Sequence, residues 1–528
     1  MSYQSFGFLL FSAVVLFAYY LFGKKMQPFV LAAANITFYA MAGVRYLPFI
    51  IVTMIATFVA GRMISKVYDK TDEKLKECTE AAEKKALRAE AKSKAKRILL
   101  GALFVAIGLL AVCKYTKFTL KNVNLLLSAV GVEEISMFNM IMPLGVSFYT
   151  FMALSYVLDI YWKRYKAEKN FLYYAVYLSY FPHVVQGPID RFNEFKDQIK
   201  DGVPFKYENI TYGAQLALWG FFKKLVIADR LNIFVSGVID NWEAYDGIMI
   251  MAAIAVYSIQ IYADFSGCID IVSGISEMFG IKLRKNFNHP YFSKTMPEFW
   301  RRWHMSLQEW FKDYVYYPVS TGALTKKVKK YYKNKGKKRS EELFASCFPV
   351  LIVWLITGIW HGAAWMYVAW GLFHAALLIG SRVFEPVFNW INKILHIDTD
   401  NFGWHLWQMI RTFTLCCIGR IFFRADGLMN ALDLIKKMVT QLSFGSILNA
   451  DIILSTGFEK TDILVSAAAI FVLLVVDIMQ EHMKVRETLA KQNLIFRWII
   501  IYIALFAVII FGIYGPGYNA SSFIYEQF

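Results

Sequence analysis

The sequence predicts an all-α protein that crosses a membrane many times. The chain of 528 residues is 57% hydrophobic and only 18% charged. Apolar runs recur from end to end, and a helix of about twenty such residues crosses a hydrocarbon core of ~30 Å. Counting the longer runs as broken pairs gives about eleven to thirteen membrane segments. The length suggests several soluble domains, but the composition excludes them.

The charge and the cysteines do not indicate nucleic acid or metal. The formal net charge is +17, and Lys and Arg accumulate in the cytoplasmic loops of membrane proteins. The six cysteines have no metal-ligand spacing, so we interpret them as small apolar fillers. We therefore expect membrane lipids as partners, no nucleic acid, no metal and no permanently bound cofactor.

Residues 1–67 are expected to form N-terminal transmembrane helices. Three apolar runs are closely spaced, at 6–22, 28–42 and 46–64. No basic residue precedes the first run, so we interpret it as a membrane helix and not a signal peptide. The positive-inside rule places Lys24 and the charged segment after Lys66 in the cytoplasm. We therefore predict an extracytoplasmic N-terminus in a bacterial cell membrane.

The rest of the chain divides into three parts. Residues 68–97 are rich in Ala, Lys and Glu, which favour helices, and we expect a cytosolic charged helix there. Residues 98–424 contain most of the remaining apolar runs and are the expected catalytic core. Residues 425–528 are expected to be C-terminal transmembrane helices.

Residues 297–318 differ from the spanning runs. At ~100° per residue, the large apolar residues, including Trp303 and Trp310, fall on one face and Arg301 and Arg302 on the other. This pattern predicts an amphipathic interfacial or re-entrant helix. His304 lies at the margin of its apolar face.

Residues 325–339 are predicted to form a basic cytosolic loop, because they contain eight lysines and one arginine. The loop either sets the topology or binds an anionic lipid or an anionic acyl donor. The sequence leaves these alternatives open.

His361 lies inside an apolar run, residues 348–367, between Trp360 and Trp365. An ionisable side chain at bilayer depth is costly and is a functional-site hypothesis by default. Imidazole titrates near physiological pH and suits a general base. A single membrane histidine is nevertheless more often structural, so the surrounding motifs decide its interpretation.

The two histidine motifs resemble those of the membrane-bound O-acyltransferase (MBOAT) family. The first is Glu298-Phe299-Trp300-Arg301-Arg302-Trp303-His304-Met305-Ser306-Leu307, followed by Phe311-Lys312-Asp313-Tyr314. The second is Trp360-His361-Gly362-Ala363-Ala364-Trp365. Further matches lie at residues 143–151, 186–191, 221–230, 260–267, 286–291 and 422–425.

The resemblance implies a ring of membrane helices with re-entrant or interfacial helices around a central funnel. His361 would then be the catalytic base, and His304 would support it from the cytosolic side. We assign substrate or donor binding to six neighbouring residues of these motifs: Trp303, Trp360, Arg301, Arg302, Asn288 and Tyr314.

The resemblance also implies a reaction. An acyl group, expected to be acetyl, would pass from a cytosolic thioester (acetyl-coenzyme A or an acyl carrier protein) to a hydroxyl of an exported cell-envelope polysaccharide. An extracytoplasmic SGNH-type partner would often receive it first. The bacterial membrane subunits that O-acetylate alginate are the most similar branch, and the D-alanyl transferases of teichoic acid synthesis are related. The alternatives are D-alanyl transfer to teichoic acid, a non-catalytic scaffold for an extracytoplasmic acyltransferase, and a transporter.

Overall fold

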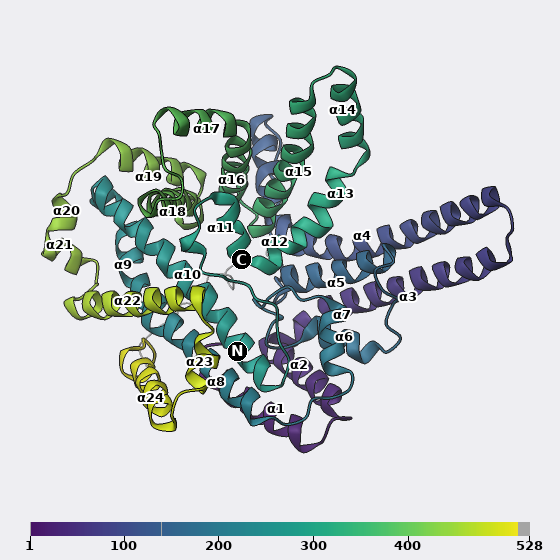
Figure 1. Cartoon of the computed structure of the whole chain (residues 1–528), viewed down its shortest axis with the longest axis horizontal. Coiled ribbons are helices and arrows are strands. Elements are labelled where there is room, and N and C mark those ends of the chain that lie inside the picture. The colour runs from purple at the N-terminus through teal and green to yellow at the C-terminus, as the bar shows by residue number, and fades with distance from the viewer. Residues whose placement is uncertain (1, 139, 516–528) are drawn as a thin grey trace. The chain divides into compact units, whose positions relative to one another are not determined.

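The computed structural model of the chain describes residues 2–138 and 140–515 (Figure 1). These residues are mainly helical, and their one β feature is an isolated bridge between Phe287 and Trp303. The all-α prediction is confirmed. The chain divides into two compact units, one formed by residues 1–214 and 272–284 and the other by residues 215–271 and 285–528.

The first unit is built on long helices. Its complete elements are α1 (Phe6–Leu21), α2 (Gln27–Gly43), η1 (Val44–Tyr46), α3 (Leu47–Glu77), α4 (Ala81–Ala129), α5 (Val146–Tyr161), α6 (Phe171–Ser179) and α7 (Phe192–Ile199). Helices α3 and α4 lie side by side and antiparallel, as the two long purple and blue helices of Figure 1 show. Gly61 lets α3 approach α5, because a Cβ there would lie 2.8 Å from Ile160.

The charged segment at 68–97 forms two helices and not one. Helix α3 ends at Glu77, residues 78–80 form the turn, and α4 begins at Ala81. The propensity of Ala, Lys and Glu for helix is realised on both sides of the turn. The chain reverses here, and the apolar parts of the two helices pack together.

The second unit contains the histidine motifs. Helix α8 (Tyr207–Phe221) enters it, and the elements that follow are η2 (Phe222–Ala228), α9 (Asp229–Ile239), η3 (Trp242–Ala244), α10 (Gly247–Met278), η4 (Pro290–Phe292), α11 (Met296–Arg302), α12 (Met305–Phe311), η5 (Lys312–Tyr316), α13 (Tyr317–Ser320), α14 (Ala323–Asn334), α15 (Lys338–His361), α16 (Trp365–Val383), α17 (Glu385–Ile394), α18 (Phe402–Arg424), α19 (Leu428–Thr440), α20 (Gly445–Leu448), α21 (Ala450–Ser455), α22 (Lys460–His482), α23 (Val485–Ala490) and α24 (Leu494–Phe511). The π-helical turns η2 and η5 interrupt longer helical stretches, as such turns often do near functional sites.

The chain is a multi-pass membrane protein. Among the described residues, seven helical segments are long and apolar enough to cross a membrane. Large apolar side chains cover their outer faces, such as Phe104 at 80% exposure and Ile495 at 73%, as expected for contact with lipid. The number is below the predicted one because α2 and α3 count as one segment and several apolar runs form helices that are too short, such as α6 with nine residues.

Two predicted elements are wrong in form. Residues 297–318 are not one amphipathic helix: α11 ends at Arg302, and α12 begins at Met305. The backbone of Asn286 and Asn288 pairs with Met305 and Arg302, which prevents a continuous helix. Residues 325–339 are not a loop, because most of them form α14, which packs against α15. Lysine is a good helix former, so a high charge density is compatible with this helix.

Candidate active site

His361 is the last residue of α15. Gly362 follows it in extended conformation, and a Cβ on Gly362 would lie 2.0 Å from the ring of Tyr367. No larger residue fits there, so the glycine of the motif lets α16 fold back directly after the histidine. The imidazole is thereby held at a fixed helix end.

Aromatic rings enclose His361, which is only 4% exposed. The centroid of its ring lies 4.8 Å from that of Trp360, 4.9 Å from Trp370 on α16 and 5.2 Å from Phe423 on α18. Three helices therefore supply one water-poor shell. Such a shell strengthens electrostatic interactions with a reacting group.

His304 occupies the break between α11 and α12. Its backbone is left-handed, with φ of +48°, which is uncommon for a residue with a side chain. Its ring lies edge-on to Phe265 of α10 at 4.9 Å, and the residue is 1% exposed. Strained conformations of this kind cluster at functional sites.

Asn286 fixes the orientation of the His304 ring. The amide oxygen of Asn286 accepts hydrogen bonds from the backbone N–H of Ser306 at 3.1 Å and from the Ser306 hydroxyl at 2.8 Å. His304 Nδ1 lies 3.1 Å from the same oxygen and therefore carries the hydrogen. Burial lowers the pKa of His304 to about 3. The neutral ring thus has its basic nitrogen at Nε2.

The indole of Trp360 connects the two histidines. Its ring centroid lies 6.4 Å from that of His304 and 4.8 Å from that of His361. The structure therefore brings together two motifs that are more than fifty residues apart in the sequence. It does so through an intervening aromatic ring.

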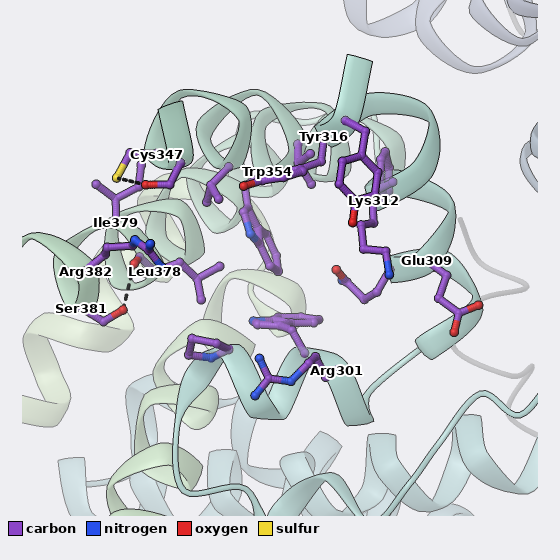
Figure 2. A pocket seen from close by; sticks show the side chains of 18 of the residues that line it. Arg301, Glu309, Lys312, Tyr316, Cys347, Trp354, Leu378, Ile379, Ser381 and Arg382 are labelled. Atoms are coloured by element: carbon purple, nitrogen blue, oxygen red, sulfur yellow. Dashed lines mark hydrogen bonds between the residues drawn. The ribbon is translucent and has the colours of Figure 1, made fainter. Parts of the chain in front are cut away.

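A cavity of about 780 Å³ lies beside this cluster. Figure 2 shows Arg301, Lys312 and Arg382 around it, with the indole of Trp354 between them. The floor is largely apolar, and Trp300 forms part of it. The ring of Trp300 packs against His374 at 4.9 Å and Trp370 at 5.7 Å, so the cavity wall adjoins the shell of His361.

The six residues predicted to bind substrate or donor do not all line this cavity. Arg301 does. Arg302 is held by ion pairs with Glu298 at 3.1 Å and Glu481 at 2.6 Å, and Asn288 accepts from Lys285 at 2.7 Å. Trp303, Trp360 and Tyr314 are buried core residues outside the cavity lining.

Sequence reasoning missed two residues at the site. His374 was assigned no role, but it lies well within α16, is 2% exposed and packs 4.9 Å from Trp370. Arg420 is 3% exposed, with its guanidinium 4.3 Å from the ring centroid of Trp303. The available signal was position: His374 follows Trp370 by one helical turn, and Arg420 stands in an apolar run.

Charges elsewhere in this unit are paired. The ammonium of Lys224 lies 2.7 Å from Asp264 and 2.9 Å from Asp229, and that of Lys223 lies 2.7 Å from Asp270. The carboxylates of α10 thus have lysine partners, and the buried ion pairs connect α10 to η2 and α9. The described residues contain no group of three or more His, Cys, Asp or Glu side chains suited to a metal ion.

The comparisons with known proteins agree with this site. Residues 168–418 match the membrane-bound O-acyltransferase family, and they include both histidines. The chain is 29% identical to the probable alginate O-acetylase AlgI of Pseudomonas syringae pv. tomato, covering 79% of this chain and 71% of the relative. It is 29% identical to the peptidoglycan O-acetyltransferase of Helicobacter pylori, covering 78% and 73%. It is 30% identical to the teichoic acid D-alanyltransferase of Bacillus subtilis, covering 54% and 69%.

Proposed function

The chain belongs to the membrane-bound O-acyltransferase family, and on that premise we propose that it moves an acetyl group from a cytosolic thioester to a hydroxyl of an exported cell-envelope polysaccharide. Its relatives are named as enzymes that acylate alginate, peptidoglycan and teichoic acid. The observation that carries the proposal is the enclosure of His361 and His304 on either side of Trp360.

In the proposed reaction His361 is the general base. Its imidazole takes the proton of the acceptor hydroxyl while the hydroxyl oxygen attacks the thioester carbonyl carbon. The carbon–sulfur bond then breaks, and the leaving thiolate takes a proton, so the base is restored. His304, neutral and oriented by Asn286, supports this transfer through its Nε2.

The cavity suits a thioester donor. A donor of this class combines a negatively charged carrier end with an apolar arm and a short acyl group. Arg301, Lys312 and Arg382 supply positive charge, and Trp300, Trp354 and Val350 supply an apolar wall. Acetyl-coenzyme A and an acyl carrier protein both present this chemistry, and the proposal includes either as substrate.

The proposed setting is a bacterial cell membrane with the N-terminus extracytoplasmic. A donor on the cytosolic side and a polysaccharide outside require transfer across the bilayer. We therefore include an extracytoplasmic SGNH-type acyltransferase as the partner that accepts the group.

D-alanyl transfer is the second candidate, because the teichoic acid D-alanyltransferase is among the relatives. It uses the same base and the same bond changes, with a D-alanyl thioester in place of the acetyl thioester. Supplying the purified chain with radiolabelled acetyl-coenzyme A or a D-alanyl carrier separates the two, since one donor alone should be consumed.

The role of His361 is tested by H361N. Asparagine keeps a polar side chain but accepts no proton, so we expect acyl transfer by the purified chain to fall about a hundredfold or more. The control is H482N at the exposed end of α22, which should retain full activity. Equal thermal unfolding midpoints would establish that both variants fold, and full transfer by H361N would contradict the proposal.

A further inference from the structure

Arg420 carries a buried positive charge that the protein does not neutralise. Within the described residues, no carboxylate lies within ion-pair distance of its guanidinium, and its Nε and Nη2 have no hydrogen-bond partner. Its contacts are the ring face of Trp303 and the hydroxyl of Tyr291. Lys223 and Lys224, which are equally buried in the same unit, each have a carboxylate partner. An unpaired charge at such depth is costly and indicates a function.

The position of Arg420 relates it to the histidines. On the same helix, Phe423 contacts His361 at 5.2 Å. On its other side, Gly419 is so close to His374 that a Cβ would lie 2.8 Å from His374 Nε2. Trp303, which covers the guanidinium, is the residue before His304. One turn of α18 thus contacts three elements of the candidate active site.

The two unpartnered nitrogens identify the chemistry of a ligand. Nε and Nη2 form one edge of the guanidinium, and that edge binds two oxygens of one anion in parallel. The chain uses this edge elsewhere: Arg284 donates from Nε and Nη2 to the two carboxylate oxygens of Glu194, at 2.8 and 2.5 Å. Trp303 covers the face of Arg420 and leaves its edge available.

We propose that Arg420 is an anion-binding residue of the transfer site, which takes a carboxylate or phosphate group of a substrate on its Nε and Nη2 edge. The proposal rests on the proposed acyl transfer, because it assigns the anion to one of the two substrates of that reaction. A phosphate would belong to the thioester donor, and a carboxylate to an acidic acceptor. In either case the anion supplies the missing counter-charge and positions the substrate beside His361.

The test measures anion binding by the full-length chain in nanodiscs. The thermal unfolding midpoint of the wild type should rise with inorganic phosphate or with D-glucuronate at constant ionic strength. Chloride and D-glucose are the uncharged or weakly binding controls and should leave it unchanged. A response to phosphate indicates the donor as the source, and a response to glucuronate indicates the acceptor.

Three variants assign the response to Arg420. R420Q should lose it, whereas R424Q should keep it, because Arg424 is already paired with Asp240 at 2.6 Å. R420K keeps the charge without the two-nitrogen edge and should bind the anion about tenfold more weakly; it decides the question if R420Q does not fold. A wild-type response to neither anion, or a wild-type response in R420K, would overturn the proposal.

Kinetics provide a second measurement. In R420K the KM for the substrate that carries the anion should rise about tenfold or more, with the other KM unchanged. A fall in kcat at unchanged KM would overturn the proposal in favour of a positioning role. H361N should still show the anion response, so a chain that binds the anion but never transfers an acyl group would contradict the proposed function and not this site.

Discussion

At the level of single residues, the sequence located both histidines but not their surroundings. His361 stood out because imidazole is rare in an apolar run. His304 was predicted at the margin of a helix, yet it lies at a helix break with left-handed backbone. The break depends on Asn286, eighteen residues earlier, and helical periodicity carries no information about such a contact. His374 and Arg420 were missed because their significance lies in packing between distant helices.

The low pKa of His304 has a consequence for stability. Between its ordinary value of 6.5 and about 3, the unfolded chain binds a proton at this position that the folded chain does not. Acidification through this range therefore destabilises the fold. We expect the unfolding midpoint of the wild type to fall by about a few degrees more than that of H304Q between about pH 7 and about pH 4.5. Equal falls in the two proteins would show that His304 is protonated in the folded state.

At the level of elements, composition predicted helices well but their ends poorly. The apolar runs became helices, and the lysine-rich segment became one as well. The ends depended on tertiary contacts, such as the pairing of residues 286–288 with 302–305. The helices that position His361 also depend on a close approach, because Gly358 of α15 lies against Gly371 of α16.

This approach predicts the effect of G371A. A Cβ on Gly371 would lie 2.4 Å from the carbonyl oxygen of Trp354 and 3.2 Å from the Cα of Gly358. The helices must separate, which costs about 1–3 kcal/mol and displaces Trp370 from His361. We expect the unfolding midpoint to fall and acyl transfer to decrease about tenfold or more.

The matched control for this element is G380A. Gly380 lies in the same helix, but a Cβ there would meet nothing within 4 Å. Alanine favours helix over glycine by about 1 kcal/mol, so G380A should be fully active and at least as stable as the wild type. If G371A behaves like G380A, the close approach of α15 and α16 does not position the site.

At the level of the whole molecule, the sequence predicted a multi-pass membrane protein correctly. Hydrophobicity is a property of whole segments, and it survives errors in individual boundaries. The number of crossings was less predictable, because short and interrupted helices such as α6, α8 and α9 are as apolar as full spans. The orientation in the membrane rests on the distribution of lysine and arginine.

Cysteine labelling tests this orientation directly. Cys78 lies in the turn between α3 and α4, and Lys335 lies exposed at the end of the basic helix α14. Charge density predicts that both positions are cytosolic. A membrane-impermeant maleimide should therefore label Cys78 in inside-out vesicles but not in intact spheroplasts, and C78S should not be labelled at that position. In a C78S background, K335C should show the same sidedness. Labelling of Cys78 in spheroplasts would reverse the predicted orientation, and labelling of the two positions from opposite sides would rule out a shared cytosolic location and with it the proposed path of the thioester.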